Sequence, residues 1–258
     1  MLTMKHALAL ILSISANFSI QTAENTSATT KQKLKIGLCI MATGRYINFM
    51  PQLIRGVNEY FCKNHDVKIF VFTDQPLEEY PNVTRVQQAK LGWPYDSMYR
   101  FKIYNQNKHL LDECDYIFAC DSDLSFVNPI GEEVLSDRVA VHHPGFINNK
   151  RGTYEEKEVL SLAYVKPNEG EHYFTGAFYG GNKKEFFALI KQLDTNVDED
   201  LKKNITALWH DESHLNRYFI DNPPTKQLST SYYYPEVWPD ANKKKILALE
   251  KNHAYFRA

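Results

Sequence analysis

The sequence predicts an α/β protein in which strands and helices alternate to build a parallel, doubly wound sheet. Three apolar runs rich in β-branched and aromatic residues, at 34–41, 67–72 and 116–120, have the length and composition of buried strands. Alternation of such runs with helical segments is typical of a sheet that carries helices on its faces. The 258 residues, of which 43% are hydrophobic, are enough for one domain with a large core.

The first helix is predicted from the spacing of its apolar residues. Phe49, Leu53, Ile54, Val57 and Phe61 recur at a helical period, which favours a helix over 49–61. Beyond residue 123 the pattern loosens, as expected for a half of the domain made of loops and shorter elements. The other predicted elements, in chain order, are a short strand at 83–86, a helix at 99–111, a strand at 139–142, a strand at 173–179 that ends at a glycine pair, and helices at 185–193 and 212–219.

Composition and charge exclude several classes of protein. The chain has 30 Lys and Arg against 31 Asp and Glu, so no excess of positive charge indicates a nucleic-acid partner. The four cysteines, Cys39, Cys62, Cys114 and Cys120, lack the clustering of a metal site. Cys39 and Cys120 fall inside predicted strands, which favours buried free thiols over a disulfide scaffold.

The first 33 residues differ from the rest of the chain. Lys5 precedes an apolar stretch that becomes polar by residue 15. This pattern favours a secretory signal peptide within residues 1–23, with a short signal anchor as the alternative, so we expect secretion or membrane association through the N-terminus. Residues 24–33 are small and polar and are predicted to be a linker. A single domain is expected over 34–258.

Two carboxylates follow the third predicted strand. Asp121 and Asp123 stand at its carboxyl end, where open α/β sheets bind ligands. Carboxylate oxygens suit Mg²⁺ or Mn²⁺, and these ions bind the oxygens of a diphosphate. An Asp-x-Asp triplet is also common in turns and at helix caps, so a metal site is predicted only together with further motifs.

A second group of polar residues opens the predicted helix at 212–219. Asp211 and Glu212, flanked by His210 and His214, are explained in part by helix capping and the macrodipole. The spacing differs from the His-Glu-x-x-His of zinc proteases. Trp209 beside these carboxylates suits stacking on a sugar and stabilisation of a developing oxocarbenium ion.

Six motifs in the same order resemble those of glycosyltransferase family 6, the family of the histo-blood-group A and B transferases, α-1,3-galactosyltransferase and Forssman synthase. The resemblance covers roughly residues 34–258. It implies a GT-A type nucleotide-sugar transferase fold, a Rossmann-like mixed sheet with helices on both faces in a single catalytic domain. Its UDP-binding half would be 34–123, and 124–258 would be the acceptor half with a C-terminal tail. The motifs lie at 72–76, 121–123, 143–146, 176–181, 209–216 and 251–253.

The resemblance also implies an activity. It is that of a metal-dependent retaining α-1,3-glycosyltransferase, a hexosyltransferase that moves galactose or N-acetylgalactosamine from the UDP-sugar to the 3-hydroxyl of a β-galactoside, with or without fucose. The expected cofactor is Mn²⁺, with Mg²⁺ as the alternative. The acceptor would be a galactose-terminated oligosaccharide or glycolipid. The expected location is the secretory pathway, in the Golgi lumen or membrane of a eukaryote, or the cell envelope of a bacterium.

Site residues follow from the resemblance position by position. Glu212 matches the catalytic residue, and Asp121 and Asp123 match the metal ligands. The matched acceptor residues are His143, Thr153 and Trp209. The matched donor residues are Met41, Thr43, Tyr46, Arg100, Asp121, Thr175, Gly176, Ala177, Asp211, Lys251 and Arg257.

Some alternatives stay open at this point. Thr175 and Ala177 match the positions that distinguish the two donor sugars, and this pair is compatible with either one. Pro235 falls near an acidic family residue that contacts the acceptor, so the acceptor is not specified. Catalysis through a covalent intermediate on Glu212 and front-face displacement are equally compatible with the sequence. A secreted carbohydrate-binding protein that keeps the fold without turnover, and a glycoside hydrolase with paired carboxylates, are the competing functions.

Overall fold

The structure is a computed structural model that describes residues 32–147, 151–239 and 244–257. The predicted signal segment at 1–23 lies outside the described residues, as does nearly all of the predicted linker at 24–33. The chain from Lys33 to Ala258 forms one compact unit. Among the described residues, no helix combines the length and the apolar character needed to cross a membrane.

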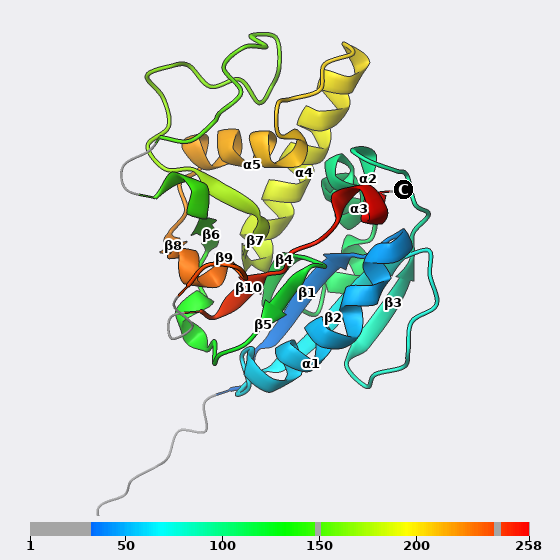
Figure 1. Ribbon diagram of the computed structural model, residues 1–258. Coiled ribbons are helices and arrows are strands. Elements are labelled where there is room, and N and C mark those ends of the chain that lie inside the picture. The colour runs from blue at the N-terminus through cyan, green and yellow to red at the C-terminus, as the bar shows by residue number, and fades with distance from the viewer. Residues whose placement is uncertain (1–31, 148–150, 240–243, 258) are drawn as a thin grey trace, which may run out of the picture. The chain divides into compact units, whose positions relative to one another are not determined.

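Seven strands of the described chain form a mixed sheet in the order β3-β2-β1-β4-β7-β6-β8 (Figure 1). Strands β1 to β4 run parallel to one another, whereas β7 is antiparallel to both of its neighbours, β4 and β6. The α/β class and the mixed sheet implied by the family resemblance are confirmed, and the wholly parallel sheet predicted from alternation is wrong at β7. The strands of this sheet are β1 (Lys35–Met41), β2 (Asp66–Thr73), β3 (Val83–Gln87), β4 (Tyr116–Asp121), β6 (Arg138–His142), β7 (Phe174–Asn182) and β8 (Lys226–Leu228).

A smaller sheet and short 3₁₀ helices complete the strand-rich part of the chain. Three short strands pair in the order β5-β10-β9, and sequence periodicity did not predict any of them. Their bounds are β5 (Leu124–Phe126), β9 (Tyr234–Pro235) and β10 (Ile246–Ala248). The 3₁₀ helices are η1 (Gly44–Phe49), η2 (Lys108–Leu111), η3 (Glu132–Val134), η4 (Pro144–Phe146) and η5 (Thr230–Tyr232).

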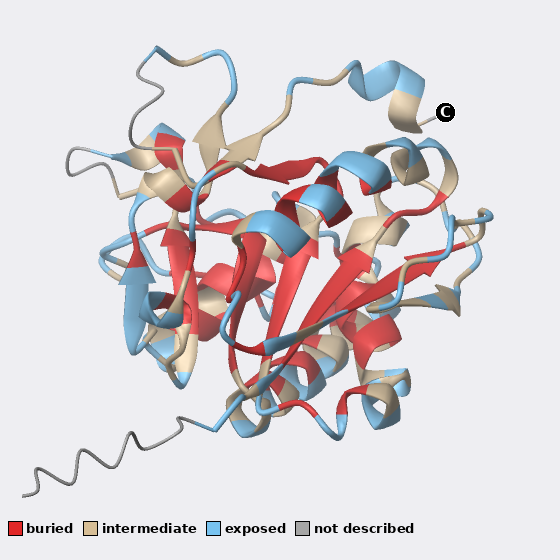
Figure 2. Cartoon of the chain, turned by 90° about the horizontal axis from the view of Figure 1, so that it is seen from below, coloured by how far each residue is buried: buried red, intermediate tan, exposed pale blue. Residues whose placement is uncertain are grey.

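Helices cover both faces of the seven-stranded sheet. Leu38 and Ile40 of β1 pack in one hydrophobic cluster with Leu53 and Ile54 of α1. Cys39, between them in the strand, faces a second cluster that includes residues of α3, α4 and α5, as the two-residue period of a strand requires. Figure 2 shows the buried strands of the sheet between helices whose outer faces are exposed. The helices are α1 (Met50–Tyr60), α2 (Tyr95–Met98), α3 (Arg100–Gln106), α4 (Lys183–Lys202), α5 (His210–Asp221) and α6 (His253–Arg257).

Several predicted boundaries differ from the structure, such as that of the helix predicted at 185–193, which spans Lys183–Lys202, and two of the differences have identifiable reasons. The helix predicted at 99–111 ends at Gln106, where the Asn107 side-chain amide donates to the Ile103 carbonyl oxygen, 2.8 Å away, and a 3₁₀ turn follows. The strand predicted to end before Gly180 runs on to Asn182. A Cβ at Gly180 would lie 2.3 Å from the Ile117 carbonyl oxygen, so glycine permits the close approach of β4 instead of ending the strand.

The cysteine prediction is confirmed. Cys39 and Cys120 are buried and free, as are Cys62 and Cys114. Burial raises the pKa of the Cys39 thiol well above its usual value, so this group stays protonated and acts as a small apolar core residue.

Candidate active site

A cavity of about 440 Å³ lies at the carboxyl ends of β1 and β4. Met41 ends β1 and Asp121 ends β4, and both line the cavity. This is the edge of an open α/β sheet at which ligands bind. Of the residues that the sequence singled out, all but His143 and Thr153 line this one cavity. They are Met41, Thr43, Tyr46, Arg100, Asp121, Asp123, Thr175, Gly176, Ala177, Trp209, Asp211, Glu212, Lys251 and Arg257.

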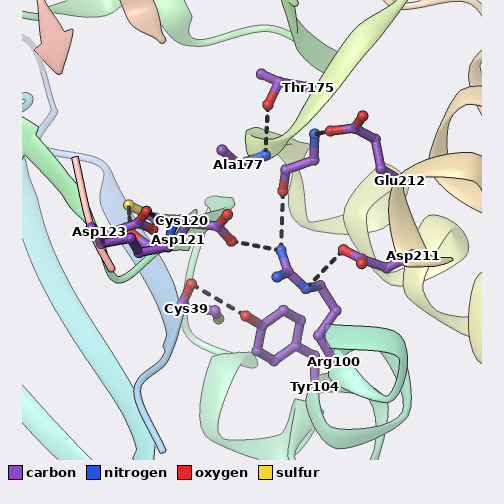
Figure 3. A network of polar contacts seen from close by, with 12 residues as sticks. Cys39, Arg100, Tyr104, Cys120, Asp121, Asp123, Thr175, Ala177, Asp211 and Glu212 are labelled. Carbon is purple, nitrogen blue, oxygen red and sulfur yellow. Dashed lines mark hydrogen bonds and ion pairs between the residues drawn. The ribbon is translucent and has the colours of Figure 1, made fainter. Parts of the chain in front are cut away.

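The buried guanidinium of Arg100 contacts three other residues that line the cavity (Figure 3). Its Nη1 donates to Asp121 Oδ1 at 2.9 Å and to the Gly176 carbonyl oxygen at 3.0 Å. Its Nε lies 3.1 Å from Asp211 Oδ2. Burial raises the pKa of Asp211 to about 6, and the charge of Arg100 opposes that rise. Arg100 therefore joins α3, β4, β7 and α5 at one point.

Glu212 is in the first turn of α5, and its carboxylate faces the backbone of β7. The Gly176 N–H donates to Glu212 Oε2 at 2.7 Å. Burial raises the pKa of Glu212 to about 7, while the hydrogen bond from Gly176 acts in the opposite direction. The Asn216 side-chain amide donates to the Glu212 carbonyl oxygen at 2.9 Å and to the Phe174 carbonyl oxygen at 2.8 Å, which fixes α5 against β7. Glu212 is thus a carboxylate held in one orientation.

Asp121 and Asp123 have the chemistry of a divalent-cation site. Both line the cavity, and the pKa of Asp123 is raised by burial and by the charge of Asp121, so a cation between them would relieve a repulsion. In this structure Lys251 forms an ion pair with Asp123. Within the described ranges, no group of three or more His, Cys, Asp or Glu side chains gathers as a metal site. Two carboxylates still fit an ion whose other ligands are water and substrate phosphates, the usual binding mode of Mg²⁺.

The C-terminal segment borders the same cavity. The Arg257 guanidinium lies 3.6 Å from the centre of the Trp93 ring, close enough for a cation–π interaction. Phe256 stacks on Phe49, with ring centres 4.8 Å apart, and lies 5.3 Å from the ring of Tyr46. These contacts hold α6 beside η1 and place two cationic side chains, those of Lys251 and Arg257, at the cavity.

The predicted acceptor residues lie at different distances from the cavity. Trp209 lines the cavity and is 48% exposed. His143 does not line it, but its ring centre is 6.0 Å from that of Tyr233, which does. Burial lowers the pKa of His143 to about 4, so the ring is neutral and its Nδ1 accepts from the Gly145 N–H at 3.1 Å. Thr153 is exposed and outside the cavity wall.

The sequence did not predict several residues of the cavity wall. Trp93, Asp96 and Ser97 belong to the loop and short helix just before Arg100, where the aromatic residues were the only signal. Tyr233 belongs to no sequence motif. It directly follows the 3₁₀ helix η5, and only the tertiary structure brings it into the cavity wall. The remaining unpredicted lining residues are Lys90, Ser122, His210 and Phe256.

The mixed sheet with helices on both faces, and a cavity at its carboxyl edge, are those of a GT-A type glycosyltransferase domain. The family model of glycosyltransferase family 6 matches residues 1–258. The chain belongs to glycosyltransferase family 6, as the motifs of the sequence predicted.

Similar proteins occur in mammals and in a bacterium. Histo-blood group ABO system transferase 1 of Rattus norvegicus is 33% identical over 242 residues, which cover 88% of this chain and 69% of the relative. Globoside alpha-1,3-N-acetylgalactosaminyltransferase 1 of Mus musculus is 32% identical over 246 residues, 87% of this chain and 69% of the relative. The O-antigen biosynthesis glycosyltransferase WbnI of Escherichia coli is 29% identical over 222 residues, 84% of this chain and 94% of the relative.

Proposed function

We propose that the protein is a metal-dependent retaining α-1,3-glycosyltransferase that moves galactose or N-acetylgalactosamine from a UDP-sugar to the 3-hydroxyl of a β-galactoside. The observation that carries the proposal is one cavity with two chemically different parts. Asp121, Asp123 and Lys251 suit a cation and a diphosphate. Glu212, fixed by the Gly176 N–H, suits the positive charge that develops on a sugar ring.

The diphosphate end of the cavity supports departure of UDP without a protein acid. We propose that Asp121 and Asp123 hold Mn²⁺, with Mg²⁺ as the alternative, which when bound stabilises the negative charge of the departing diphosphate. Lys251 and Arg257 add two positive charges and, with the aromatic contacts of α6, exclude water from the leaving group. The phosphate oxygen that departs is the proposed base for the acceptor hydroxyl.

Glu212 is the proposed catalytic residue at the sugar end. Retention of configuration requires either a covalent glycosyl intermediate on this carboxylate or departure and attack on one face of the sugar. In the second route Glu212 stabilises the oxocarbenium-like state through its charge. Asp211 is held by Arg100 and is proposed to accept a hydrogen bond from the donor sugar.

Substrate specificity is proposed to reside in the walls of the cavity. Thr175 and Ala177 line it next to Gly176, and small side chains there leave room at the sugar. Trp209 is the proposed stacking surface for the acceptor, and His143 and Thr153 stay predictions for further acceptor contacts. The acceptor class that we propose is a galactose-terminated oligosaccharide or glycolipid, which would be met in a secretory compartment or a cell envelope.

The test is a transfer assay with purified protein that begins at Lys31. UDP-galactose and UDP-N-acetylgalactosamine are offered separately, with and without Mn²⁺, to lactose and 2′-fucosyllactose, and UDP release and product linkage are measured. The expected result is metal-dependent transfer of one sugar that is lost in Glu212→Gln and Asp123→Asn. UDP binding without turnover across a wider glycan panel would indicate the carbohydrate-binding alternative. Absence of UDP binding would exclude the transferase.

A further inference from the structure

Glu155 belongs to the segment of chain that connects β6 to β7, and it has no role in the proposed reaction. It is 4% exposed and does not line the cavity. Its Oε1 accepts hydrogen bonds from the backbone N–H groups of Lys157 and Glu158, both at 3.0 Å. Its Oε2 accepts from the N–H of Leu208 at 2.6 Å. One carboxylate thus joins the segment after β6 to the residue that precedes Trp209.

This carboxylate is satisfied by backbone donors. In the described part of the chain, Glu155 makes no ion pair with a Lys, Arg or His side chain. A buried carboxylate is costly unless it is hydrogen-bonded, and three N–H donors offset that cost here. An apolar side chain at this position would leave the same N–H groups without acceptors. The role of Glu155 is therefore to fix two pieces of backbone relative to each other.

A second buried carboxylate ties the same segment to the helices behind the cavity. Asp200 of α4 is 1% exposed and accepts from the Leu162 N–H at 2.9 Å and from the Ser161 hydroxyl. His214 of α5 has its Nε2 3.6 Å from Asp200 Oδ2. The segment is therefore attached at two points, and Asp200 limits how far it can shift if the contact at Glu155 is lost.

We propose that Glu155 is a positioning residue for the acceptor, an inference that rests on the proposed transferase function. It holds the backbone around Thr153, two residues earlier, in a fixed relation to Trp209 on the cavity wall. Asp121 and Asp123, which are proposed to bind the diphosphate of UDP through the metal, lie on β4 and the turn after it, and the Glu155 carboxylate contacts neither. Loss of the carboxylate should weaken acceptor binding and leave UDP binding unchanged.

The test compares Glu155→Gln with Glu171→Gln, a matched control on the same segment whose side chain is 88% exposed. Glutamine has one oxygen and an NH₂ group that cannot accept, so it can satisfy only one side of the connection. Lactose affinity is measured directly by NMR titration in the presence of UDP and Mn²⁺, and UDP affinity by calorimetry. We expect lactose affinity to fall about tenfold in Glu155→Gln, with UDP affinity within about twofold of wild type and no change in the control.

Three results would overturn the proposal. The first is an unchanged lactose affinity in folded Glu155→Gln. The second is a parallel loss of UDP and lactose affinity, which would mean that Glu155 stabilises the whole domain and does not act on the acceptor alone. Should Glu155→Gln fail to fold, Glu155→Asp supplies the test, because the shorter carboxylate keeps its charge but cannot reach the N–H groups of Lys157, Glu158 and Leu208 at once: a selective loss of lactose affinity is expected, and no loss is the third. Wild-type protein that binds lactose and UDP but transfers nothing would contradict the proposed function, not the role of Glu155.

Discussion

Arg100 and Asp211 form a buried ion pair, with Nε 3.1 Å from Oδ2, that connects α3 to the first turn of α5. The same guanidinium donates to Asp121 at the end of β4. The guanidinium of Arg100 therefore lies between Asp121, which is proposed to hold the metal, and Asp211, which is proposed to bind the sugar, and it fixes their separation. A change at Arg100 should affect both.

Arg100→Lys should reduce stability and activity together. Lysine keeps the charge but lacks the planar fork that reaches Asp121 and Asp211 at once. Leaving one buried carboxylate without its partner is expected to lower the free energy of unfolding by about 3 kcal/mol, and transfer by more than about tenfold. Urea unfolding and initial rates check this. Arg138→Lys, whose partner Glu185 is partly exposed, should change unfolding by less than about 1 kcal/mol; equal losses in the two variants would contradict the prediction.

The rate should rise with pH through an acidic limb near neutrality. Burial raises the pKa of Glu212 to about 7, so the group is neutral below that pH and ionised above it. Only the ionised form stabilises positive charge on the sugar. The pH profile of kcat/KM for the donor, which reports the free enzyme, should show this limb. Glu212→Gln should remove the limb and lower the rate by about a hundredfold or more. A limb that persists in Glu212→Gln would assign it to another group.

Removal of divalent metal should abolish transfer, and Mn²⁺ should restore it. Asp123→Asn replaces one charged oxygen donor, so the Mn²⁺ concentration for half-maximal rate should rise by at least about tenfold. A Mn²⁺ titration of the transfer rate, after treatment with a chelator, measures this. Asp66→Asn is the control. Asp66 begins β2, so it lies at the amino ends of the parallel strands, away from the cavity at their carboxyl ends, and it pairs with exposed Lys33. Full activity in the presence of chelator would contradict metal dependence.

The cation–π contact of Arg257 should contribute to UDP binding. Trp93→Leu removes the ring that the guanidinium covers, and a contact of this kind contributes about 1 kcal/mol, so UDP affinity should fall about fivefold. Calorimetric titration with UDP measures the change. Tyr95→Leu alters an exposed ring at the start of α2, two residues after Trp93, that stacks on Tyr99, and the UDP affinity of this variant should match wild type. Equal affinities in the two variants would leave the contact without a role.

Two glycines of β7 should respond differently to alanine. A Cβ at Gly180 would lie 2.3 Å from the Ile117 carbonyl oxygen, so Gly180→Ala should lower the free energy of unfolding by about 3 kcal/mol or more. A Cβ at Gly176 would meet the Glu212 Cβ at 3.4 Å, an ordinary contact. Gly176→Ala should fold normally yet lose activity, because the added methyl lies beside the Glu212 carboxylate. Thermal melting and transfer rates separate the two effects.

The sequence predicted the first half of the fold well because its elements have clear periodicity. The strand β1 is a continuous apolar run that is buried on both faces, and the helix α1 buries one set of apolar residues at helical spacing. The direction of β7 could not be predicted, since an apolar run is the same whether its neighbours are parallel or antiparallel. Strands as short as β9 or β10 have too few residues to show a pattern.

The candidate site was predicted mainly from the family resemblance. Asp121 and Glu212 belong to local motifs, and the fold brings them into one cavity as expected. Tyr233 was missed because only the tertiary structure places it in the wall. Thr153 was singled out by its match to the family, yet it is exposed and outside the wall, so its role stays a prediction.

The strand β7 has two parts with opposite tolerance for substitution. At Gly180 the neighbouring strand leaves no room for a side chain. Thr175 and Ala177 lie beyond the last pair with β4, Cys120 with Phe178, and they line the cavity. Because neither residue pairs with β4, a change at either position alters the wall of the cavity without meeting the close approach that excludes a side chain at Gly180. Under the proposed function, sugar preference can therefore diverge during evolution by single substitutions while the same fold is inherited intact.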